Sequence, residues 1–335
     1  MIFIFNPETD YALSVGEGQY TAPKSVIALR LRLSPVISSV LSSSDYMLLF
    51  SEEERERVRR EVIDRRYARH SEFVTIEELT QLLEIISDEE KIIFAWGWNH
   101  TLCKLLKKAG VESSLLPSIT ALDSLRRLSH RRTTIVFNQE LNKLLSLNIP
   151  IPKELTDLGE AMSLLEKNPD CFLKSPWSCS GRGVVRTTDL SSSDIKNRIR
   201  STINRQGSIM IENAASKEID FASEWYINEG VAHFLGLSVF QVSPTGEYKG
   251  NIIASQEELA GLIYEATPLW SSDYIDAQKV TLEKIIAPNY SGPVGIDMLV
   301  EIDKSIRPCI EVNLRHTMGH VALARHRDWA FGNKI

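Results

Sequence analysis

The stretch GPVGIDMLVEIDKSIRPCIEVNLR, residues 292–315, decides the fold of this chain. Its pattern predicts two strands joined by a turn at residues 303–305. Side chains alternate between the two faces of a strand, so each face can be read separately. The even-numbered face is apolar and is expected to be buried; it carries Val294, Ile296, Met298, Val300, Ile302, Pro308, Ile310, Val312 and Leu314. The other face carries Asp297, Leu299, Glu301, Arg307, Cys309, Glu311, Asn313 and Arg315.

The polar face of this hairpin brings two carboxylates together. If Ile302 and Ile306 close the turn, Asp297 lies directly opposite Glu311, and Asn313 lies one diagonal step away. Opposed strand residues have Cβ atoms roughly 5 Å apart, where like charges repel. Two carboxylates and an amide oxygen are hard ligands of the kind that Mg²⁺ binds beside phosphates. Taken alone, the hairpin is compatible with either a solvated sheet face or a metal site.

Composition narrows the possible partners. The chain has 335 residues, enough for more than one domain, with 43% hydrophobic and 24% charged residues, as in ordinary globular proteins. The net charge is −6 and no basic stripe is present, so no nucleic-acid partner is expected. We find no signal peptide and no apolar run of about 20 residues, so we expect a cytoplasmic protein with no membrane partner. We interpret the cysteines as free thiols; they are Cys103, Cys171, Cys179 and Cys309.

The first third of the chain alternates strand and helix patterns, which predicts an open, mostly parallel sheet. Strands are expected at 2–5, 46–50 and 91–95, and helices at 24–41, 52–69 and 101–109. A further helix, ending at Ile86, is expected to open with a capping box at 75–78.

Two loops of this region follow strands, at 6–11 and 96–100. Ligands of open sheets bind at the carboxyl ends of strands, so these loops are candidates for a substrate pocket. Alternatively, the tryptophans pack between layers and the polar residues cap a turn. The candidate substrate residues are Asn6, Glu8, Asp10, Trp96 and Trp98.

The middle of the chain places a lysine on an apolar strand. Asn138 is expected to cap a helix at 139–147, and a second helix is expected at 158–167. The strand at 171–176 then carries Lys174, and a Ser/Gly-rich loop at 177–183 leads into a strand at 184–187. A buried lysine is costly unless an anion meets it, and a glycine loop can direct backbone N–H groups at phosphate oxygens. An ordinary hairpin turn remains the alternative, and the loop is not a P-loop because no GK[ST] follows.

The last third adds a strand at 208–211 that ends in Glu212, and two antiparallel strands at 219–228 and 231–241. A loop at 242–250 carries Lys249, and helices are expected at 256–264 and 276–286.

Taken in order, these features resemble the ATP-grasp superfamily over residues 127–320. The matching motifs are NIPIPKE, FLKSPWSCSGRGVV, IMIENAASKEID, GPVGIDMLV and CIEVNLRHTMGH. The resemblance implies an N-terminal α/β substrate-side domain at 1–126, followed by a two-part ATP-grasp domain with antiparallel sheets. Its lid subdomain is expected at 127–206 and its metal-binding subdomain at 207–335.

The resemblance also implies a role for each matching residue. Lys174 would contact the α- and β-phosphates of ATP, under a loop containing Ser180, Gly181 and Gly183. Near the adenine would lie Glu212, with the backbone of Ile211 and Asn213. Asp220 or Glu218 would contact the ribose, and Lys249 would be a second phosphate-binding lysine. Asp297, Glu311 and Asn313 match the metal ligands, and Arg315 matches the arginine that steadies the transferring phosphate. The chain lacks the lysine that the family often carries before NIPIP, and Arg131 and Arg132 are the candidates to replace it.

The implied function is an ATP-dependent ligase with two Mg²⁺ ions, or Mn²⁺ in their place, between Asp297 and Glu311. Such an enzyme converts a substrate carboxylate to an acyl phosphate, which an amine or thiol then attacks. A small-molecule or peptide carboxylate and an amine are the expected substrates. Two alternatives stay open: a kinase of the same fold that phosphorylates a hydroxyl, and a nucleotide-binding module without catalysis. The sequence specifies neither the substrate nor the oligomeric state.

Overall fold

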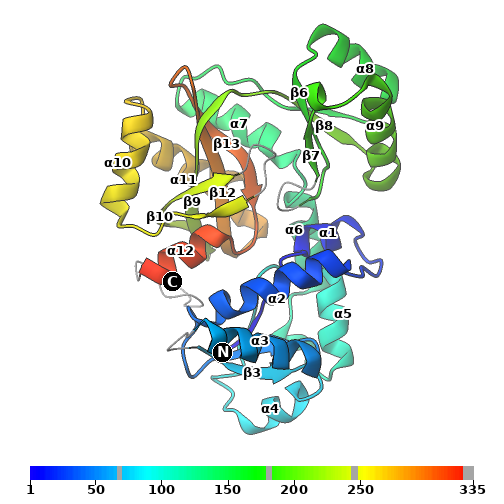
Figure 1. Cartoon of the computed structure of the whole chain (residues 1–335), viewed down its shortest axis with the longest axis vertical. Helices are drawn as coiled ribbons and strands as arrows, with labels where there is room; N and C mark the ends of the chain where they lie inside the picture. The colour runs from blue at the N-terminus through cyan, green and yellow to red at the C-terminus, as the bar shows by residue number, and fades with distance from the viewer. Residues whose placement is uncertain (66–69, 179–182, 243–247, 327–335) are drawn as a thin grey trace.

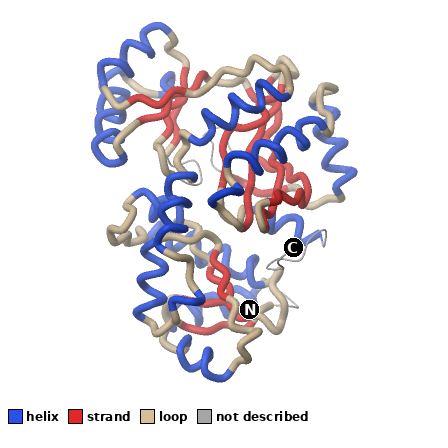
Figure 2. Tube along the Cα trace, turned by 180° about the vertical axis from the view of Figure 1, so that it is seen from behind, coloured by secondary structure: helices blue, strands red, loops and turns tan. Residues whose placement is uncertain are grey.

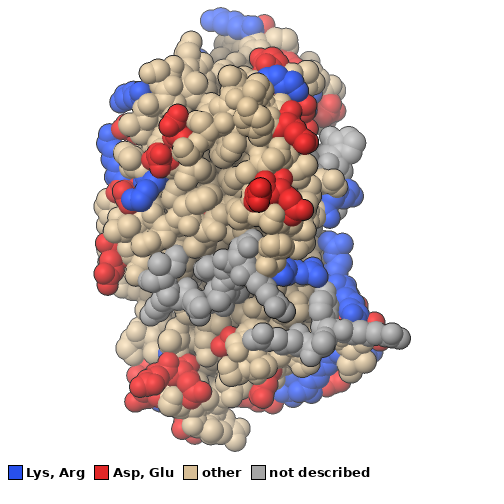
Figure 3. All heavy atoms as spheres, turned by 90° about the vertical axis from the view of Figure 1, so that its left-hand side faces the viewer, with Lys and Arg blue, Asp and Glu red and all other residues tan. Residues whose placement is uncertain are grey.

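The computed structural model describes residues 1–65, 70–178, 183–242 and 248–326, and these ranges form three β-sheets with helices around them (Figure 1). One sheet is parallel and two are antiparallel, which confirms the predicted fold class. On the face shown in Figure 3, Lys and Arg groups are interspersed with Asp and Glu groups. No helix within the described ranges is long and apolar enough to cross a bilayer.

The N-terminal sheet has the strand order β3-β2-β1-β4 and all its strands are parallel. Of its two inner strands, Ile2–Ile4 is fully buried, as expected for a parallel sheet that is covered on both faces. The strands are β1 (Ile2–Ile4), β2 (Tyr46–Leu49), β3 (Glu72–Thr75) and β4 (Ile93–Ala95). The helices are α1 (Thr9–Ser14), α2 (Lys24–Ser38), α3 (Glu52–Asp64), α4 (Leu79–Ile85) and α5 (His100–Lys108), followed by the 3₁₀ turn Ser113–Leu115.

Two local predictions for this region were wrong. The segment expected to be a loop at 6–11 turns into helix α1 at Thr9. Thr75 ends strand β3 and does not cap a helix. The Glu78 carboxylate accepts a hydrogen bond from the Thr75 N–H (2.9 Å), which is half of the expected capping box, and α4 begins one residue later.

A small antiparallel sheet forms the part of the molecule at the top right of Figure 1. Its strand order is β5-β8-β6-β7, with helices α8 and α9 covering its apolar side. The strands are β5 (Lys153–Leu155), β6 (Cys171–Lys174), β7 (Val184–Arg186) and β8 (Ile209–Asn213); the helices are α8 (Leu158–Lys167), the 3₁₀ turn Thr187–Asp189 and α9 (Ser192–Gln206). Strand β8 pairs with β6, so the run of chain that builds this sheet extends past residue 206.

Two helices connect the N-terminal region to this sheet, α6 (Ile119–Leu128) and α7 (Thr133–Leu144). The prediction that Asn138 caps a helix was wrong, because Asn138 lies inside α7. Its buried Nδ2 donates to the Cys309 carbonyl (2.9 Å) and so ties α7 to the C-terminal hairpin.

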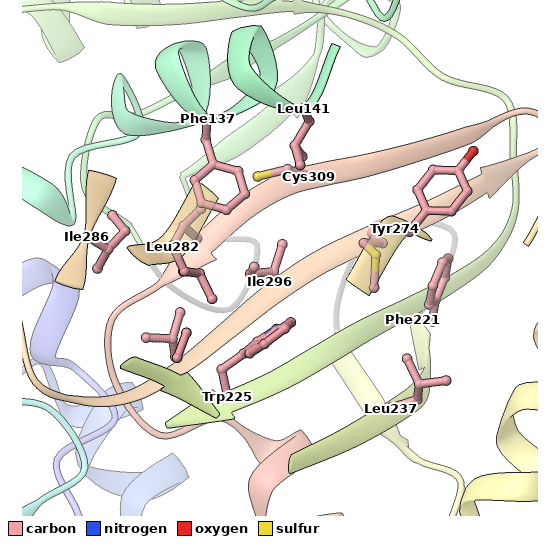
Figure 4. Packing of buried hydrophobic residues seen from close by; sticks show 14 of the residues in the cluster. Phe137, Leu141, Phe221, Trp225, Leu237, Tyr274, Leu282, Ile286, Ile296 and Cys309 are labelled. Carbon is pink, nitrogen blue, oxygen red and sulfur yellow. The ribbon is translucent and has the colours of Figure 1, made fainter. Parts of the chain in front are cut away.

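The C-terminal sheet has the order β11-β10-β9-β12-β13. Its strands are β9 (Lys217–Asn228), β10 (Val231–Val242), β11 (Tyr248–Asn251), β12 (Gly292–Glu301) and β13 (Ile306–Asn313); its helices are α10 (Gln256–Ala266), α11 (Asp273–Ile285), the 3₁₀ turn Ala287–Asn289 and α12 (Met318–His326). Figure 4 shows the apolar cluster between this sheet and the helices, with Phe137 of α7 and Leu282 of α11 directed at Trp225 and Ile296.

The register of the hairpin is correct at its centre and wrong near its turn. Asp297 pairs with Glu311 as predicted, but Val300 pairs with Ile306, so Ile302 lies beyond the ladder and is 65% exposed. Residues 308–310 of β13 bulge opposite Met298. The bulge directs Cys309 into the apolar core, against the prediction that it lies on the polar face.

The last helix returns to the first sheet. Val321 of α12 belongs to the same apolar cluster as Phe3, Phe5 and Trp96. Figures 1 and 2, seen from opposite sides, both place α12 between the C-terminal and N-terminal sheets.

Candidate active site

The opposed carboxylates of Asp297 on β12 and Glu311 on β13 form the centre of the candidate site. Asp297 is partly exposed, yet protein surrounds it on most sides. This burial is the main cause that raises the pKa of Asp297 to about 8, and the charges of Glu311 and Glu224 add to it. The Arg315 charge and a hydrogen bond from Asn313 Nδ2 to Asp297 Oδ2 (3.2 Å) act in the opposite direction.

This arrangement fits a divalent cation. Within the described ranges no three His, Cys, Asp or Glu side chains gather as a metal-binding group, so the third donor here would be the Asn313 amide oxygen. Its Nδ2 faces Asp297 and its Oδ1 accepts from Arg315, so the amide would have to turn over to offer that oxygen. All three donors are hard oxygens, as Mg²⁺ requires. After burial, the charge of Glu311 is the next cause of the raised pKa of Asp297, and a cation would relieve that repulsion.

Of the two arginines proposed for the missing lysine, the structure brings Arg131 to the site. Its Nη2 donates to Glu311 Oε1 (2.7 Å), its guanidinium is buried, and its backbone N–H donates to the Pro176 carbonyl (3.0 Å). Arg132 instead contacts Glu154 (2.8 Å) and is largely exposed. Arg131 therefore joins the hairpin to the loop that follows Lys174.

Lys174 is buried at the end of β6 and forms an ion pair with Glu212 of β8. Its loop closes through a hydrogen bond from the Ser175 N–H to the Gly183 carbonyl (2.8 Å). A Cβ at Gly183 would lie 2.3 Å from Ser178 Cβ, so only glycine permits this approach. Ser180 and Gly181 lie outside the described residues.

Sequence reasoning missed Arg307, which is 6% exposed. It donates to Glu301 (2.6 Å) and to the Asn213 carbonyl (3.0 Å), and it lies 3.6 Å from Glu212. Ile211, the third residue of the predicted adenine contact, pairs with strands on both sides of β8. The sequence did indicate that Arg307 could form ion pairs, because it lies on the same predicted strand face as two acids, Glu301 and Glu311.

The residues predicted to contact ribose and a second phosphate lie farther along the sheet. Asp220 pairs with Lys217 (2.6 Å) and Glu218 with Lys304 (2.6 Å). Lys249 was expected in a loop, but it is an exposed residue of β11, at the sheet edge opposite to β13. The structure does not bring these three residues into contact with the carboxylate pair.

The N-terminal candidates fall into two groups. Asp10 joins the site, because it accepts a hydrogen bond from Arg315 Nε (2.9 Å), and Arg315 Nη2 donates to Asn313 Oδ1 (2.8 Å). Trp98 is partly buried beside the site.

The other N-terminal candidates stabilise the fold around it. Asn6 forms two hydrogen bonds with the Gly97 backbone (2.7 and 3.3 Å), and Trp96 packs edge-on against Phe5 at 4.9 Å with 4% exposure. Glu8 pairs with Arg30 (3.1 Å), and burial raises the pKa of the Glu8 carboxyl.

A buried cluster under the site was also missed. Glu224 is 1% exposed and accepts hydrogen bonds from Ser238 (2.9 Å) and Thr317 (2.8 Å), and it lies 3.0 Å from His320 Nδ1. Burial lowers the pKa of His320, while the Glu224 charge acts to raise it. This cluster attaches α12 to the back of the carboxylate pair.

Comparison with known proteins gives two kinds of result. No sequence-family model matches the chain. A stretch of 153 residues, 44% of the chain, is 28% identical to the butirosin acyl-carrier protein–L-glutamate ligase of Niallia circulans. The match spans 33% of that protein, so the chain corresponds to about a third of the curated relative.

Solved structures match over nearly the whole chain. N5-carboxyaminoimidazole synthetase of Staphylococcus aureus, complexed with ADP, aligns over 95% of this chain and 71% of its own, with a TM-score of 0.53 and 13% identity. Biotin carboxylase of Campylobacter jejuni, in a β-γ-ATP complex, aligns over 96% and 67%, with a TM-score of 0.55 and 14% identity. The biotin carboxylase domain of Hydrogenobacter thermophilus 2-oxoglutarate carboxylase, crystallised with MgADP, aligns over 100% and 70%, with a TM-score of 0.54 and 12% identity. We conclude that this chain is built on the ATP-grasp fold.

Proposed function

We propose that the chain is an ATP- and Mg²⁺-dependent carboxylate–amine ligase that releases ADP. A carboxylate oxygen of the substrate attacks the γ-phosphorus of ATP, and the bond to ADP breaks. An amine or thiol then attacks the acyl carbon, loses its proton and displaces phosphate. The observation that carries the proposal is the opposed pair of Asp297 and Glu311, where the pKa of Asp297 is about 8. The ligase name of the curated relative and the nucleotides bound to the structural neighbours support it.

Asp297, Glu311 and Asn313 would hold Mg²⁺, or Mn²⁺ in its place. When bound, the metal would neutralise charge on the phosphate oxygens.

Carboxylates hold the cations of the site in place. Arg131 contacts Glu311, Lys174 contacts Glu212, and Arg315 contacts Asp10. Cations held in place before the reaction stabilise the charge that develops during phosphoryl transfer at little reorganisation cost.

The remaining predicted contacts belong to the same proposal. Residues 1–126 would supply the substrate side, 127–206 the lid, whose sheet is completed by β8, and the rest of 207–335 the metal ligands. Ile211, Glu212 and Asn213 would contact the adenine, with Arg307 as a positioning residue behind them. Glu218 or Asp220 would contact the ribose, Lys249 a phosphate, and Ser180, Gly181 and Gly183 would close over the nucleotide.

Calorimetric titration of ATP, with and without Mg²⁺, tests this function on the wild type and on Glu311→Gln. We expect binding that depends on Mg²⁺ and weakens in the variant. Screening carboxylate and amine pairs for ADP release then tests the ligase step. A stable phosphoester without amide formation would indicate the kinase alternative, and ATP binding without any turnover would indicate the non-catalytic one. Absence of ATP binding in both conditions contradicts the proposal.

A further inference from the structure

A groove of about 290 Å³ runs between the N-terminal and C-terminal sheets. One wall is a continuous run of chain, residues 91–98, which includes all of strand β4. The facing wall includes Leu115, Tyr226, Tyr290, Pro293, Leu314 and Arg315. Strand β4 itself covers Ile93–Ala95, the middle of this wall.

The strand along this groove is a sheet edge. Strand β4 ends the order β3-β2-β1-β4, and within the described ranges no other strand pairs with its outer side. The Ile92 carbonyl accepts from the Ile2 N–H (2.8 Å), and the Trp96 N–H donates to the Ile4 carbonyl (2.7 Å). Alternate residues of a parallel ladder face the neighbouring strand, so the peptide groups of Ile93 and Ala95 point to the outer side. The groove wall therefore presents N–H and C=O groups at the spacing of a β-strand.

An ion pair lies at one end of this edge, formed by Arg315 and Asp10 (2.9 Å). The His316 N–H donates to the Trp96 carbonyl (2.8 Å), which places the segment carrying Arg315 at the carboxyl end of β4. Arg315 lines the groove and contacts Asn313 (2.8 Å), which in turn contacts Asp297 (3.2 Å). An anionic group at this end of the groove would thus lie beside the proposed site of phosphoryl transfer.

Building on the proposed function, we propose that the carboxylate substrate is the carboxyl terminus of an extended peptide, which adds to β4 as a parallel strand. Hydrogen bonds to the Ile93 and Ala95 peptide groups would hold the chain, as in other cases of strand addition. Parallel addition is the direction that places the terminal carboxylate at Arg315, and it continues the parallel pairing of the whole sheet. Trp98, Tyr226 and Tyr290 would contact alternate side chains of the peptide. A free amino acid would use the Arg315 end but would leave the strand edge unpaired.

The first test uses hexapeptide libraries that are acetylated at the N-terminus and end in either a carboxylate or a carboxamide. The libraries are passed over the immobilised full chain with Mg²⁺ and a non-hydrolysable ATP analogue, and retained peptides are identified by mass spectrometry. We expect the acids to be retained at least about tenfold more than the amides, since the charged contact with Arg315 is lost in the amides. Equal retention of both libraries would overturn the proposal.

Backbone methylation of a retained peptide tests the strand pairing itself. Methyl groups on alternate nitrogens that face β4 should weaken binding about tenfold each, while those on the intervening nitrogens should have little effect. Uniform sensitivity, or none, would argue against strand addition.

Two variants of one turn provide a matched pair. Ser114 lines the groove and is exposed, so Ser114→Trp should block the peptide and weaken its binding at least tenfold. Its neighbour Ser113 is exposed and does not line the groove, so Ser113→Trp should bind peptide normally. Both variants should retain Mg²⁺-dependent ATP binding. An alternative outcome is that the wild type binds ATP with Mg²⁺ and yet releases ADP as well with free amino acids, or with carboxylates on a pantetheine arm, as with peptides. In that case strand addition is wrong and the ligase proposal stands.

Discussion

The pKa of Asp297 reflects both the burial of its carboxyl and the charges around it. Its folded pKa of about 8 lies above its ordinary value of 3.8, mainly because of burial and then because of Glu311. The folded chain therefore binds a proton at this position more tightly than the unfolded chain between pH 4 and pH 8. Stability contributed by this group consequently falls as pH rises through that window.

The corresponding prediction concerns Asp297→Asn. Without metal, we expect the wild type to lose more thermal stability than the variant when pH is raised from 5 to 8, because the amide cannot ionise. Mg²⁺ at pH 8 should raise the Tm of the wild type more than that of the variant. Calorimetric scans measure both effects. Asp303→Asn is the control, because hydrogen bonds from Ser305 lower the pKa of that exposed carboxyl. Parallel pH profiles for wild type and Asp297→Asn would contradict the prediction.

Arg307 gives a second prediction at this scale. Replacing it by Met removes the partner of Glu301 and the nearest cation of Glu212 other than Lys174, so buried charge is left uncompensated. We expect Arg307→Met to lower the free energy of unfolding by about 3–5 kcal/mol. The exposed pair of Arg186 and Asp170 is the control, for which Arg186→Met should cost about 0–1 kcal/mol. Urea denaturation measures the free energy of unfolding of both variants. Equal losses would show that the ion pairs of Arg307 stabilise the fold no more than an exposed pair does.

At the residue scale, the sequence could predict contacts between residues that are close along the chain but not contacts between remote segments. Asp297 and Glu311 are brought together by one hairpin, so strand alternation was enough to pair them. Glu224 and Arg131 reach the same pair from remote segments, and no local pattern encodes such meetings.

At the element scale, two helical glycines differ in what surrounds them. A Cβ at Gly319 of α12 would lie 1.8 Å from Glu224 Oε1, whereas a Cβ at Gly261 of α10 would have no described atom within 4 Å. Gly319 therefore permits the close packing of α12 on the buried Glu224 cluster.

We expect Gly319→Ala to destabilise the fold by about 1–3 kcal/mol, because Glu224 must move from its buried hydrogen bonds. Gly261→Ala should stabilise it by up to about 1 kcal/mol, because alanine favours a helix. Thermal unfolding of both variants checks the contrast. A stabilising Gly319→Ala would mean that α12 can move away from Glu224 without loss.

Helices and strands were predictable where the hydrophobic periodicity agrees with the residues that begin and end each element. Helix α8 matches its predicted bounds, and both strands of the β9–β10 hairpin were expected. The bulge in β13 was not, because it is fixed by contacts from other elements: Gln278 of α11 donates to the Pro308 carbonyl (2.8 Å), and Asn138 of α7 donates to the Cys309 carbonyl. Tertiary hydrogen bonds outweighed regular strand pairing there.

At the scale of the whole molecule, one ion pair joins the first sheet to the proposed catalytic site. Asp10 follows β1 and holds Arg315, which follows β13. The motif order could predict that both belong to one enzyme, but their contact depends on how the sheets dock.

We expect Asp10→Asn to lower the rate of ADP release at least about tenfold while leaving ATP affinity within about twofold, because Arg315 loses its charged partner and Lys174 does not. Steady-state kinetics and calorimetry separate the two effects. Asp123→Asn, which alters an exposed acid 3.1 Å from His100, is the control. A parallel loss of ATP affinity would show that Asp10 supports the nucleotide instead.

The position of α12 has a consequence for synthesis on the ribosome. The cluster of Phe3, Phe5 and Trp96 is covered in part by Val321, which is translated more than two hundred residues after Trp96. The first sheet can therefore form early, but one apolar side of it must wait for α12 before it is closed. During that interval the nascent chain would present this surface to chaperones, and the closing of the first domain would coincide with the completion of the C-terminal sheet and its helices.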